Sequence, residues 1–321
     1  MNAIVKTDFQ IPGVKKIHTG KVRDIYEVEG KDLLVVIATD RISAFDVVLP
    51  VGIPFKGSVL NEVAFDFLGK AEAAGICDTW IVNKIHPMVT VGRKVKPFAI
   101  EMIVRGYLTG SLWREYNKGV RQICGLTLPD GMEEFEMFEM PIVTPTTKAE
   151  NGHDENISPE EIVAQGLATK EEYEEMENVA IQLFDMGTEV AYKKGLILVD
   201  TKYEFGKTDC GEIILIDELH TPDSSRYWYE DSYWTAKTPR SLDKEFVRQW
   251  LISQGFKGEK NQQMPEFTKE FVEEISERYL ELYDNIMGEK LVKTDYSLEE
   301  IEAAIKDFIE GMEEVEHPKT D

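Results

Sequence analysis

The stretch LILVDTKYEFGKTDCGEIILIDELHTPDSSRYW, from Leu196 to Trp228, decides the fold that we expect. Two apolar runs flank a polar turn, and this pattern predicts a β-hairpin. Alternate residues of a strand share one face, so Asp200, Lys202 and Glu204 are expected on one face while the apolar residues between them pack on the other. The strand is therefore expected to present an acid–base–acid row from a packed sheet.

The charged row has two interpretations. Glu204 and Asp217 can meet across the hairpin and hold Mg²⁺, which prefers carboxylates together with nucleotide phosphates, while Lys202 holds a phosphate. The turn that follows adds polar groups for a second ligand: Asp223, Ser225 and Arg226. The alternative is a set of cross-strand salt bridges on a solvated face. That alternative explains Lys202 well, but not the mixture of Asp, Ser and Arg after a strand of Ile and Leu.

Outward from the hairpin, the chain is rich in strands first and in helices last. Alternation at 22–28 and a buried run at 32–40 predict an N-terminal hairpin, and a helical pattern follows at 58–75. Later helical patterns lie at 110–119, 170–194, 241–255, 267–288 and 297–314. This order predicts an α+β fold, with an N-terminal antiparallel-sheet subdomain and its helix at 1–107 and a larger α+β subdomain with C-terminal helices at 108–321.

The net charge narrows the range of partners. The chain has 36 basic and 60 acidic residues among 321, which gives a net charge of −24. Such a surface repels nucleic acid, and an enzyme that acts on phosphates must then concentrate its cations in a local pocket. The Glu-rich runs at 159–177 and 297–316 are expected to be solvated helical faces.

The cysteines and the apolar runs indicate the compartment. There are three cysteines and no CxxC pair, which argues against a disulfide framework or a zinc site and favours a reduced cytoplasm. No run reaches the roughly 18 apolar residues that a membrane helix needs. We therefore expect a cytoplasmic protein that binds neither a membrane nor nucleic acid.

Two other stretches are suited to anions. In HTGKVRD, Gly20 lets backbone N–H groups approach a phosphate that Lys21 and Arg23 can neutralise, although a turn with solvated cations gives the same pattern. In EMIVRGYLTGSLW, Arg105 ends an apolar strand and Ser111 lies where a helix begins, which is a favourable anion site. An N-cap serine beside a surface arginine is the alternative there.

A further polar group follows the buried run at 32–40. Asp40, Arg41, Ser43 and Asp46 can line a site at the end of that strand. Asp and Ser are also common turn formers, so turn chemistry explains the same residues equally well.

Six motifs follow one another along the chain: GKVRDIYEV, DRISAFDVVLP, EMIVRGYLTGSLW, TKAENGHDENIS, LVDTKYEFG and IDELHTPDSSRYW. In that order they resemble the SAICAR synthetase (phosphoribosylaminoimidazole-succinocarboxamide synthase) family in its longer form. The resemblance runs from Gly20 to about Trp228. It implies an antiparallel-sheet N-terminal part and a larger α+β part, with ATP in the cleft between them.

The resemblance also implies a reaction, an ATP-dependent ligation in purine biosynthesis. L-Aspartate is joined to carboxyaminoimidazole ribotide (CAIR) to give SAICAR, ADP and phosphate. The implied route passes through an acyl phosphate, because a carboxylate is a poor electrophile until its oxygen becomes a leaving group. ATP and Mg²⁺ are then the cofactors, CAIR and L-aspartate are the other small-molecule partners, and the protein is expected to be a monomer or a small homo-oligomer.

Roles for individual residues follow from the resemblance. Those implied for ATP are phosphate binding by Gly20, Lys21, Arg23 and Lys202, and adenine binding by backbone groups from Glu101 to Ile103. Those implied for Mg²⁺ are Glu204 and Asp217. Those implied for the ribotide are Arg105, Ser111, Ser225 and Arg226 on its phosphate and carboxylate, Asp223 on its sugar or ring, and Ser43, Asp46 and Lys56 along the substrate side. Lys148, Asp154 and Lys202 are the expected catalytic residues, and the first two are candidates to assist deprotonation of the amine.

Two other functions compete with the ligase. A phosphotransferase of kinase-like layout also places a glycine turn and a lysine in a sheet lobe, but the chain lacks an HRD-like catalytic loop and a DFG motif. A non-catalytic nucleotide-binding module predicts the loss of a metal ligand or a phosphate-binding lysine. The chain keeps all four such residues: Lys21, Lys202, Glu204 and Asp217.

Overall fold

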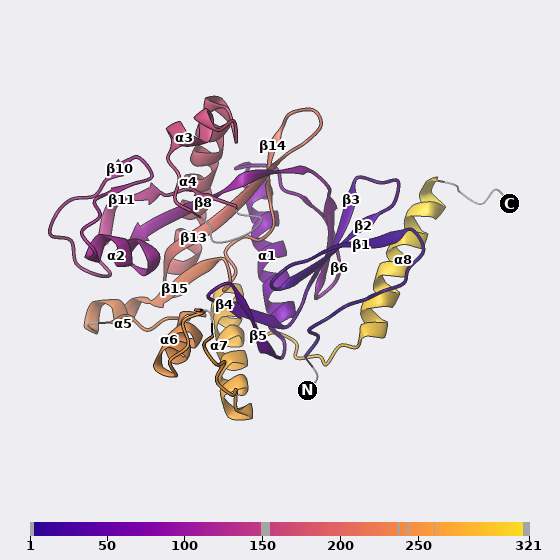
Figure 1. Ribbon diagram of the computed structural model, residues 1–321. Helices are drawn as coiled ribbons and strands as arrows, with labels where there is room; N and C mark the ends of the chain where they lie inside the picture. The colour runs from indigo at the N-terminus through magenta and orange to yellow at the C-terminus, as the bar shows by residue number, and fades with distance from the viewer. Residues whose placement is uncertain (1–2, 149–154, 237, 243, 260, 317–321) are drawn as a thin grey trace. The chain divides into compact units, whose positions relative to one another are not determined.

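The computed structural model describes residues 3–148, 155–236, 238–242, 244–259 and 261–316 (Figure 1). The chain forms two compact units, each assembled from separate stretches of sequence. The first unit contains Met1–Asp66, Trp80–Lys94 and Phe246–Asp321. The second unit contains Phe67–Thr79 and Val95–Glu245.

The first unit is built on a five-stranded antiparallel sheet in the order β1-β2-β3-β7-β6. Its strands are β1 (Val14–Thr19), β2 (Arg23–Val28), β3 (Leu33–Ala38), β6 (Ile81–His86) and β7 (Val89–Arg93). Strands β2 and β3 form the predicted N-terminal hairpin. A separate two-stranded hairpin consists of β4 (Arg41–Ala44) and β5 (Val47–Gly52).

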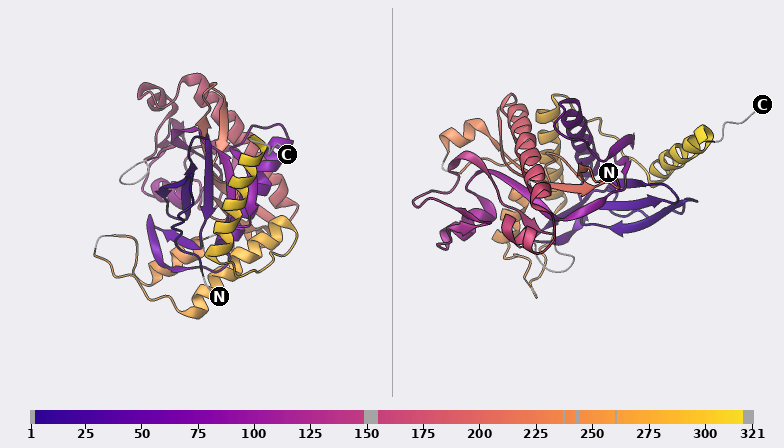
Figure 2. Two further views of the ribbon diagram at one scale, coloured as in Figure 1. Left: turned by 90° about the vertical axis from the view of Figure 1, so that its right-hand side faces the viewer. Right: turned by 90° about the horizontal axis from the view of Figure 1, so that it is seen from above.

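Helix α8 (Leu298–Glu316) packs on the five-stranded sheet (Figure 2). Ile301 and Ile305, one turn apart, are fully buried in the same hydrophobic core as Tyr26 and Val35 of the sheet. The other helices that lie at least partly in this unit are α1 (Lys56–Ala73), α6 (Glu245–Ser253) and α7 (Lys269–Met287).

The second unit is built on a six-stranded antiparallel sheet whose centre is β13. Its strands are β8 (Lys96–Tyr107), β11 (Met137–Val143), β12 (Thr146–Thr147), β13 (Leu196–Lys207), β14 (Ile213–Ile216) and β15 (Ser225–Tyr229). Strand β8 pairs with β13 from Asp200 to Lys207 along one edge, while β15 and β14 share the other edge. The predicted hairpin is therefore present as β13 and β14.

Helix α4 (Lys170–Tyr192) packs against β8 and β13 (Figure 1). A capping box fixes its start, because the Thr169 side chain accepts from the Glu172 N–H while the Glu172 side chain accepts from the Thr169 N–H. Its buried residues recur at helical spacing and form one face: Tyr173, Met176, Ala180, Leu183, Phe184, Gly187 and Ala191. The remaining elements of this unit are α2 (Gly110–Asn117), β9 (Gln122–Ile123), β10 (Leu126–Thr127), α3 (Pro159–Ala164) and α5 (Glu230–Thr235).

The α+β class predicted from the sequence is confirmed, but the two units do not coincide with the division expected at residue 107. Strand β8 hydrogen-bonds to β13 and so belongs to the second sheet. The C-terminal helices α7 and α8 return to the first unit. Neither pairing is local in sequence, and for that reason the order of elements along the chain does not reveal it.

Candidate active site

The polar row on β13 is the centre of the candidate site in the second unit. Across the β8–β13 ladder, Asp200 lies opposite Arg105, and Glu204 lies opposite Glu101. Residues that oppose each other in neighbouring strands point to the same face, so β8 adds an acid and a base to the row. All four side chains are mostly buried, although each belongs to an ionisable residue type. Burial of this kind is tolerated only when charges are paired.

Lys202 sits among three carboxylates. Its Nζ donates a hydrogen bond to Glu101 Oε1 at 3.0 Å, forms an ion pair with Glu204, and lies 3.9 Å from Asp217 Oδ2. Lys148 forms a second ion pair with Glu204. Three acids and two bases thus form one cluster, which we call the Lys202 cluster.

The pKa values of Lys202 and Glu204 favour the charged forms of these two groups. Burial lowers the pKa of Lys202, but the charges of Glu204, Glu101 and Asp217 outweigh it and raise the pKa well above its ordinary value. Burial raises the pKa of Glu204, but the charges of Lys202 and Lys148 outweigh it and lower the pKa. At neutral pH, Lys202 is therefore a fixed ammonium and Glu204 a fixed carboxylate, which is a preorganised environment for phosphate and metal.

Two arginines form a second cluster at the other end of the row. Arg226 Nη1 donates to Asp200 Oδ2 at 2.8 Å, and Arg105 Nη1 lies 3.4 Å from the same oxygen. Arg105 also donates through Nε to Thr144 Oγ1 at 2.8 Å and through Nη2 to Ser111 Oγ at 3.3 Å. Two guanidinium groups converge on the Asp200 carboxylate, and Glu245 Oε2 lies 4.0 Å from Arg226 Nη2. Guanidinium groups bind phosphate and carboxylate oxygens well, so the cluster is a candidate anion site.

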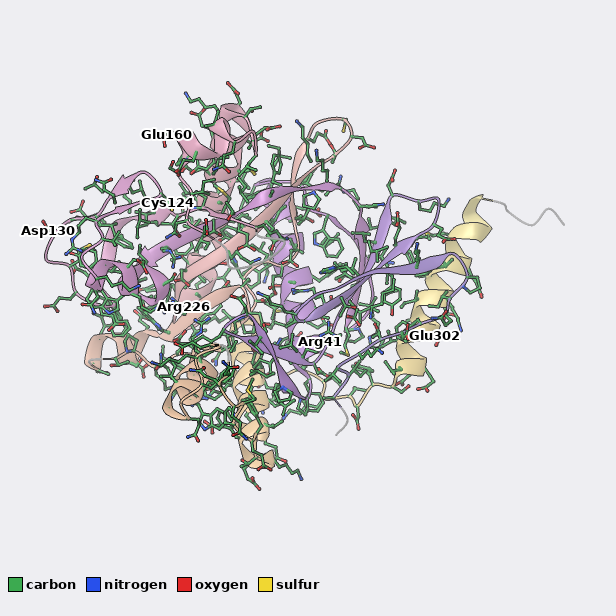
Figure 3. The ribbon with its side chains drawn as sticks, in the orientation of Figure 1. Arg41, Cys124, Asp130, Glu160, Arg226 and Glu302 are labelled. Carbon is green, nitrogen blue, oxygen red and sulfur yellow. The ribbon has the colours of Figure 1, made fainter. Side chains whose placement is uncertain are left out.

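The start of helix α2 lies beside these arginines. The N-cap residue, Thr109, makes no side-chain cap hydrogen bond, so the first turn of the helix keeps N–H groups for another acceptor. Gly110 has φ +60, and a Cβ at this position would lie 2.6 Å from Arg226 Nη1. The glycine therefore leaves the space that is occupied by the guanidinium of Arg226, a residue labelled in Figure 3. A helix N-terminus, Ser111 and two guanidiniums together suit a phosphate monoester.

The loop 217–224 joins β14 to β15 and carries two of the predicted residues. Asp217 adopts a left-handed backbone conformation with φ +64 directly after β14. The Asp223 N–H donates to Thr221 Oγ1 at 3.2 Å, which fixes the turn before β15. Ser225 opens β15, and its hydroxyl lies 2.7 Å from Thr201 Oγ1. The loop thus brings Asp217 to the Lys202 cluster and leads into Arg226.

The glycine turn 20–23 lies in the first unit, and hydrogen bonds from Arg41 hold it in place. The Gly20 N–H donates to Arg23 O at 2.7 Å, which closes the turn. Arg41 donates to Gly20 O at 3.0 Å and to Lys21 O at 3.2 Å, and it also binds the buried Asp24 at 2.8 Å. Lys21, about half exposed, pairs with Asp46, whose side chain is similarly exposed. The turn and its cations therefore exist as predicted, and their role with ATP stays a prediction.

Several predicted site residues are engaged in structural contacts. The backbone of Glu101–Ile103 lies in an interior strand between β13 and β11–β12, and Ile103 O already accepts from the Thr144 N–H at 2.8 Å. These backbone groups are engaged in the sheet, and the adenine role implied for them stays a prediction. Lys56 is fully buried, with Nζ 5.2 Å from the Tyr279 ring centroid, and its place along the substrate side stays a prediction as well.

Other predicted residues have structural partners or fall outside the described chain. Ser43 is buried within β4. Asp46 lies in the two-residue turn between β4 and β5 with φ +60. Asp154 lies outside the described residues.

The sequence interpretation assigned no role to Asp200 and none to the side chain of Glu101. Asp200 bridges the two arginines, and the Glu101 carboxylate binds Lys202. A usable signal existed, because Glu101 and Arg105 alternate along one strand as Asp200 and Glu204 do along the other. The missing information was which strands are neighbours.

The structure contains no ready-made metal cage in the part of the chain that it describes. There, no group of three or more His, Cys, Asp or Glu side chains is arranged to hold a metal ion. None of the described helices is both long and apolar enough to cross a membrane.

Comparison with known proteins agrees with these features. The family model described as SAICAR synthetase matches residues 16–294. A phosphoribosylaminoimidazole-succinocarboxamide synthase of Bacteroides thetaiotaomicron is 56% identical over 316 residues, which cover 96% of this chain and 99% of the relative. The structure of SAICAR-synthase from Saccharomyces cerevisiae complexed with SAICAR is 34% identical, with a TM-score of 0.78, over 90% of this chain and 99% of the other. A SAICAR synthetase (Type-2) in complex with ADP is 26% identical, with a TM-score of 0.66, over 85% and 98%. With a family match over most of its length and these full-length relatives, the chain belongs to the SAICAR synthetase family.

Proposed function

We propose that this SAICAR synthetase joins L-aspartate to the carboxylate of CAIR at the expense of ATP, and that the polar row on β13 divides the work. The Lys202 cluster would handle the transferred phosphoryl group, and the arginine cluster would hold the ribotide. The observation that carries this assignment is the alternation of Asp200, Lys202 and Glu204 on one buried strand face, with Arg105 and Glu101 opposite.

The carboxylates near Lys202 fit Mg²⁺ as a companion of a nucleotide. Mg²⁺ takes one or two carboxylates and completes its coordination with phosphates and water, so a full protein cage is not required. Glu204 and Asp217 would hold it, and the positive charge would ease attack on the γ-phosphorus. Lys202, fixed between Glu101 and Glu204, would face the same phosphate as a permanent cation. In the first unit, Gly20, Lys21 and Arg23 would bind ATP phosphates.

The arginine cluster supports ribotide binding. Arg105, Arg226, Ser111 and the first turn of α2 present donors that match the oxygens of a phosphate monoester. Ser225 and Asp223, beside Arg226 in sequence, would contact the rest of the ribotide. Asp200 keeps both guanidiniums in place, so less side-chain freedom is lost when the ligand binds.

The proposed reaction has two steps. A carboxylate oxygen of CAIR attacks the γ-phosphorus, the bond between the γ-phosphorus and the β,γ-bridging oxygen breaks, and ADP leaves with that oxygen. The aspartate amine then attacks the acyl carbon, phosphate departs with the carbon–oxygen bond electrons, and the amine loses a proton. Negative charge on the departing groups is stabilised by cations that are fixed before reaction, chiefly Lys202. Lys148, as the ion-pair partner of Glu204, would add a cation rather than accept the proton.

The decisive experiment is ADP release from MgATP and CAIR with L-aspartate present or omitted, with SAICAR followed by its absorbance. We expect ADP and SAICAR to form together and only with aspartate. Phosphate transfer to a hydroxyl without need of aspartate would favour the phosphotransferase, and no ADP at all would favour the binding module. ADP release from ATP in the presence of CAIR but without aspartate would indicate hydrolysis of an acyl phosphate. That result would support only the first step of the reaction.

A cytoplasmic location and a monomeric or small homo-oligomeric state belong to the same proposal.

A further inference from the structure

The loop 217–224 contains a histidine that the proposed reaction does not use. His220 is fully buried, and its backbone is left-handed with φ +55. A non-glycine residue in this conformation is uncommon and costs free energy, so the surrounding packing must hold it there. Asp217, three residues earlier, is left-handed as well.

Three contacts fix the His220 ring and backbone. Nε2 lies 2.8 Å from the hydroxyl of Tyr203, and the ring meets the edge of Phe67 at a centroid distance of 4.9 Å. The carbonyl oxygen accepts a hydrogen bond from the Tyr227 hydroxyl at 2.9 Å. The loop is therefore tied at its middle both to β13 and to β15.

Helix α4 leaves room for the ring at one position. A Cβ at Gly187 would lie 2.3 Å from His220 Cε1, a separation that real Cβ atoms essentially never show. Gly187 is otherwise placed like any buried residue of the α4 face, where alanine would be the better helix former. Gly187 thus allows the His220 ring to pack in direct contact with helix α4.

Tyr203 gives the histidine its connection to the candidate site. It lies between Lys202 and Glu204 on β13, and its own side chain is buried on the opposite face of the strand. The hydrogen bond between Tyr203 and His220 therefore joins the strand that carries Lys202 and Glu204 to the loop that carries Asp217 and Asp223.

We propose that His220 is a positioning residue, a pin that sets the loop 217–224 against β13 and so fixes the place of Asp217 relative to Glu204. The inference rests on the proposed function, in which these two carboxylates hold Mg²⁺. His220 touches neither the metal nor a substrate. Its contribution is to hold a strained loop in the one arrangement that brings Asp217 to the Lys202 cluster.

Burial also keeps this pin uncharged. Burial lowers the pKa of His220 to about 3, so the ring is neutral throughout the physiological range. A neutral ring needs no counter-ion in its apolar surroundings, and its contact with Tyr203 persists from mildly acidic to alkaline pH.

The test uses three substitutions in the full-length protein, each of which alters the contacts of the His220 ring in a different way. Tyr203→Phe removes one hydroxyl, Gly187→Ala pushes against the ring, and His220→Leu keeps an apolar side chain but loses the hydrogen bond. Mn²⁺ serves as the probe, and its binding is measured directly by electron paramagnetic resonance with ADP present. The half-saturating Mn²⁺ concentration for turnover and the urea stability are measured alongside.

We expect His220→Leu to weaken Mn²⁺ binding about 10-fold, as the loss of an outer partner of a metal site commonly does. Tyr203→Phe and Gly187→Ala should weaken it in the same direction. The double variant Tyr203→Phe with His220→Leu should be no weaker than His220→Leu alone, because both changes remove one contact.

Two matched variants separate positioning from loss of stability. Tyr173→Phe removes another buried tyrosine hydroxyl of this unit, which binds Glu177 rather than the loop. Gly69→Ala adds a Cβ to a helical glycine with open space around it. Both should bind Mn²⁺ as the unaltered protein does.

Mn²⁺ binding by the variants distinguishes a failure of the inference about His220 from a failure of the proposed function. If Asp217→Asn loses Mn²⁺ while Tyr203→Phe, Gly187→Ala and any folded His220→Leu protein bind it normally, the pin is refuted and the metal site stands. If Asp217→Asn binds Mn²⁺ normally, the metal site itself is wrong, and the role of His220 falls with it.

Discussion

At the scale of single residues, the neighbours Asp40 and Arg41 show how buried charges become backbone anchors. Asp40 accepts hydrogen bonds from the Ile4 N–H at 2.7 Å and from the Gly57 N–H at 2.9 Å. Arg41, labelled in Figure 3, donates to the carbonyls of Val5, Gly20 and Lys21. The sequence left open whether these residues line a site or form turns. For these two residues the structure favours anchoring, because their polar groups bind backbone.

Asp40 should make the stability of the protein depend on pH. Burial raises its pKa to about 6 from the ordinary 3.8, ahead of the opposing hydrogen bonds from Gly57 and Ile4. Between these two values the folded state binds more protons than the unfolded state, so stability contributed by this group falls as pH rises from about 4 to about 6. The loss amounts to about 3 kcal/mol when complete.

The measurement is urea unfolding of the unaltered protein and of Asp40→Asn at pH 4 and pH 7. Any constant cost of the substitution cancels when the two pH values are compared. We expect the unaltered protein to lose about 2–3 kcal/mol relative to Asp40→Asn over this range. A difference that stays constant with pH would show that Asp40 titrates as an exposed carboxyl does.

At the scale of elements, strand β13 was predictable along its own length but not in its pairing. The alternation of charged and apolar residues from Val199 to Glu204 predicted a strand with one polar face, and the structure has it. The pairing of Asp200 with Arg105 joins residues that are 95 positions apart, and no local pattern encodes such a contact. For that reason the sequence did not reveal that the Glu101 carboxylate lies beside Lys202, and the roles implied for 101–103, the arginines and Ser111 stay predictions.

Helix α2 lies next to Arg226 at Gly110, and we expect an alanine at this position to weaken substrate binding. Gly110→Ala places a Cβ 2.6 Å from Arg226 Nη1 and forces a side chain onto a backbone with φ +60. We expect a loss of about 1 kcal/mol or more of stability, together with a raised KM for CAIR and little change in the KM for ATP. Arg226→Ala, which removes the guanidinium itself, should raise the KM for CAIR about 10- to 100-fold.

Gly119→Ala is the matched control for the strained backbone. Gly119 also has positive φ, at +95, but a Cβ there would meet nothing within 4 Å. It should lower stability without changing either KM. If Gly110→Ala and Gly119→Ala have the same effect on CAIR, contact with Arg226 is not the cause. If Arg226→Ala raises the KM for CAIR and for ATP equally, Arg226 does not belong to the ribotide site.

At the scale of the whole molecule, the chain has a net charge of −24, and the two clusters gather four cationic groups beside four carboxylates. The expectation that an acidic chain concentrates cations to bind phosphates stays a prediction. The sequence predicted two subdomains with one boundary at residue 107, whereas each compact unit of the structure combines separate stretches of the chain. The return of α7 and α8 to the first unit depends on long-range packing that composition and periodicity do not express.

The same charge should make stability rise with salt. Repulsion among like charges opposes the compact state, and ions screen it over about 10 Å at 0.1 M. We expect the thermal midpoint to increase by a few degrees between 20 and 200 mM NaCl, measured by circular dichroism at pH 7.5. A midpoint that falls with salt would mean that the surface ion pairs outweigh the repulsion.

The place of α8 in the first core has a consequence for the order of events on the ribosome. Tyr26 and Val35 leave the exit tunnel early, yet Ile301 and Ile305, which complete their core, are made after the entire second unit. The second unit can fold around β13 before α8, the helix that covers the first sheet, has been synthesised. During synthesis, the N-terminal sheet is therefore the part of the nascent protein that remains exposed longest to chaperones and proteases.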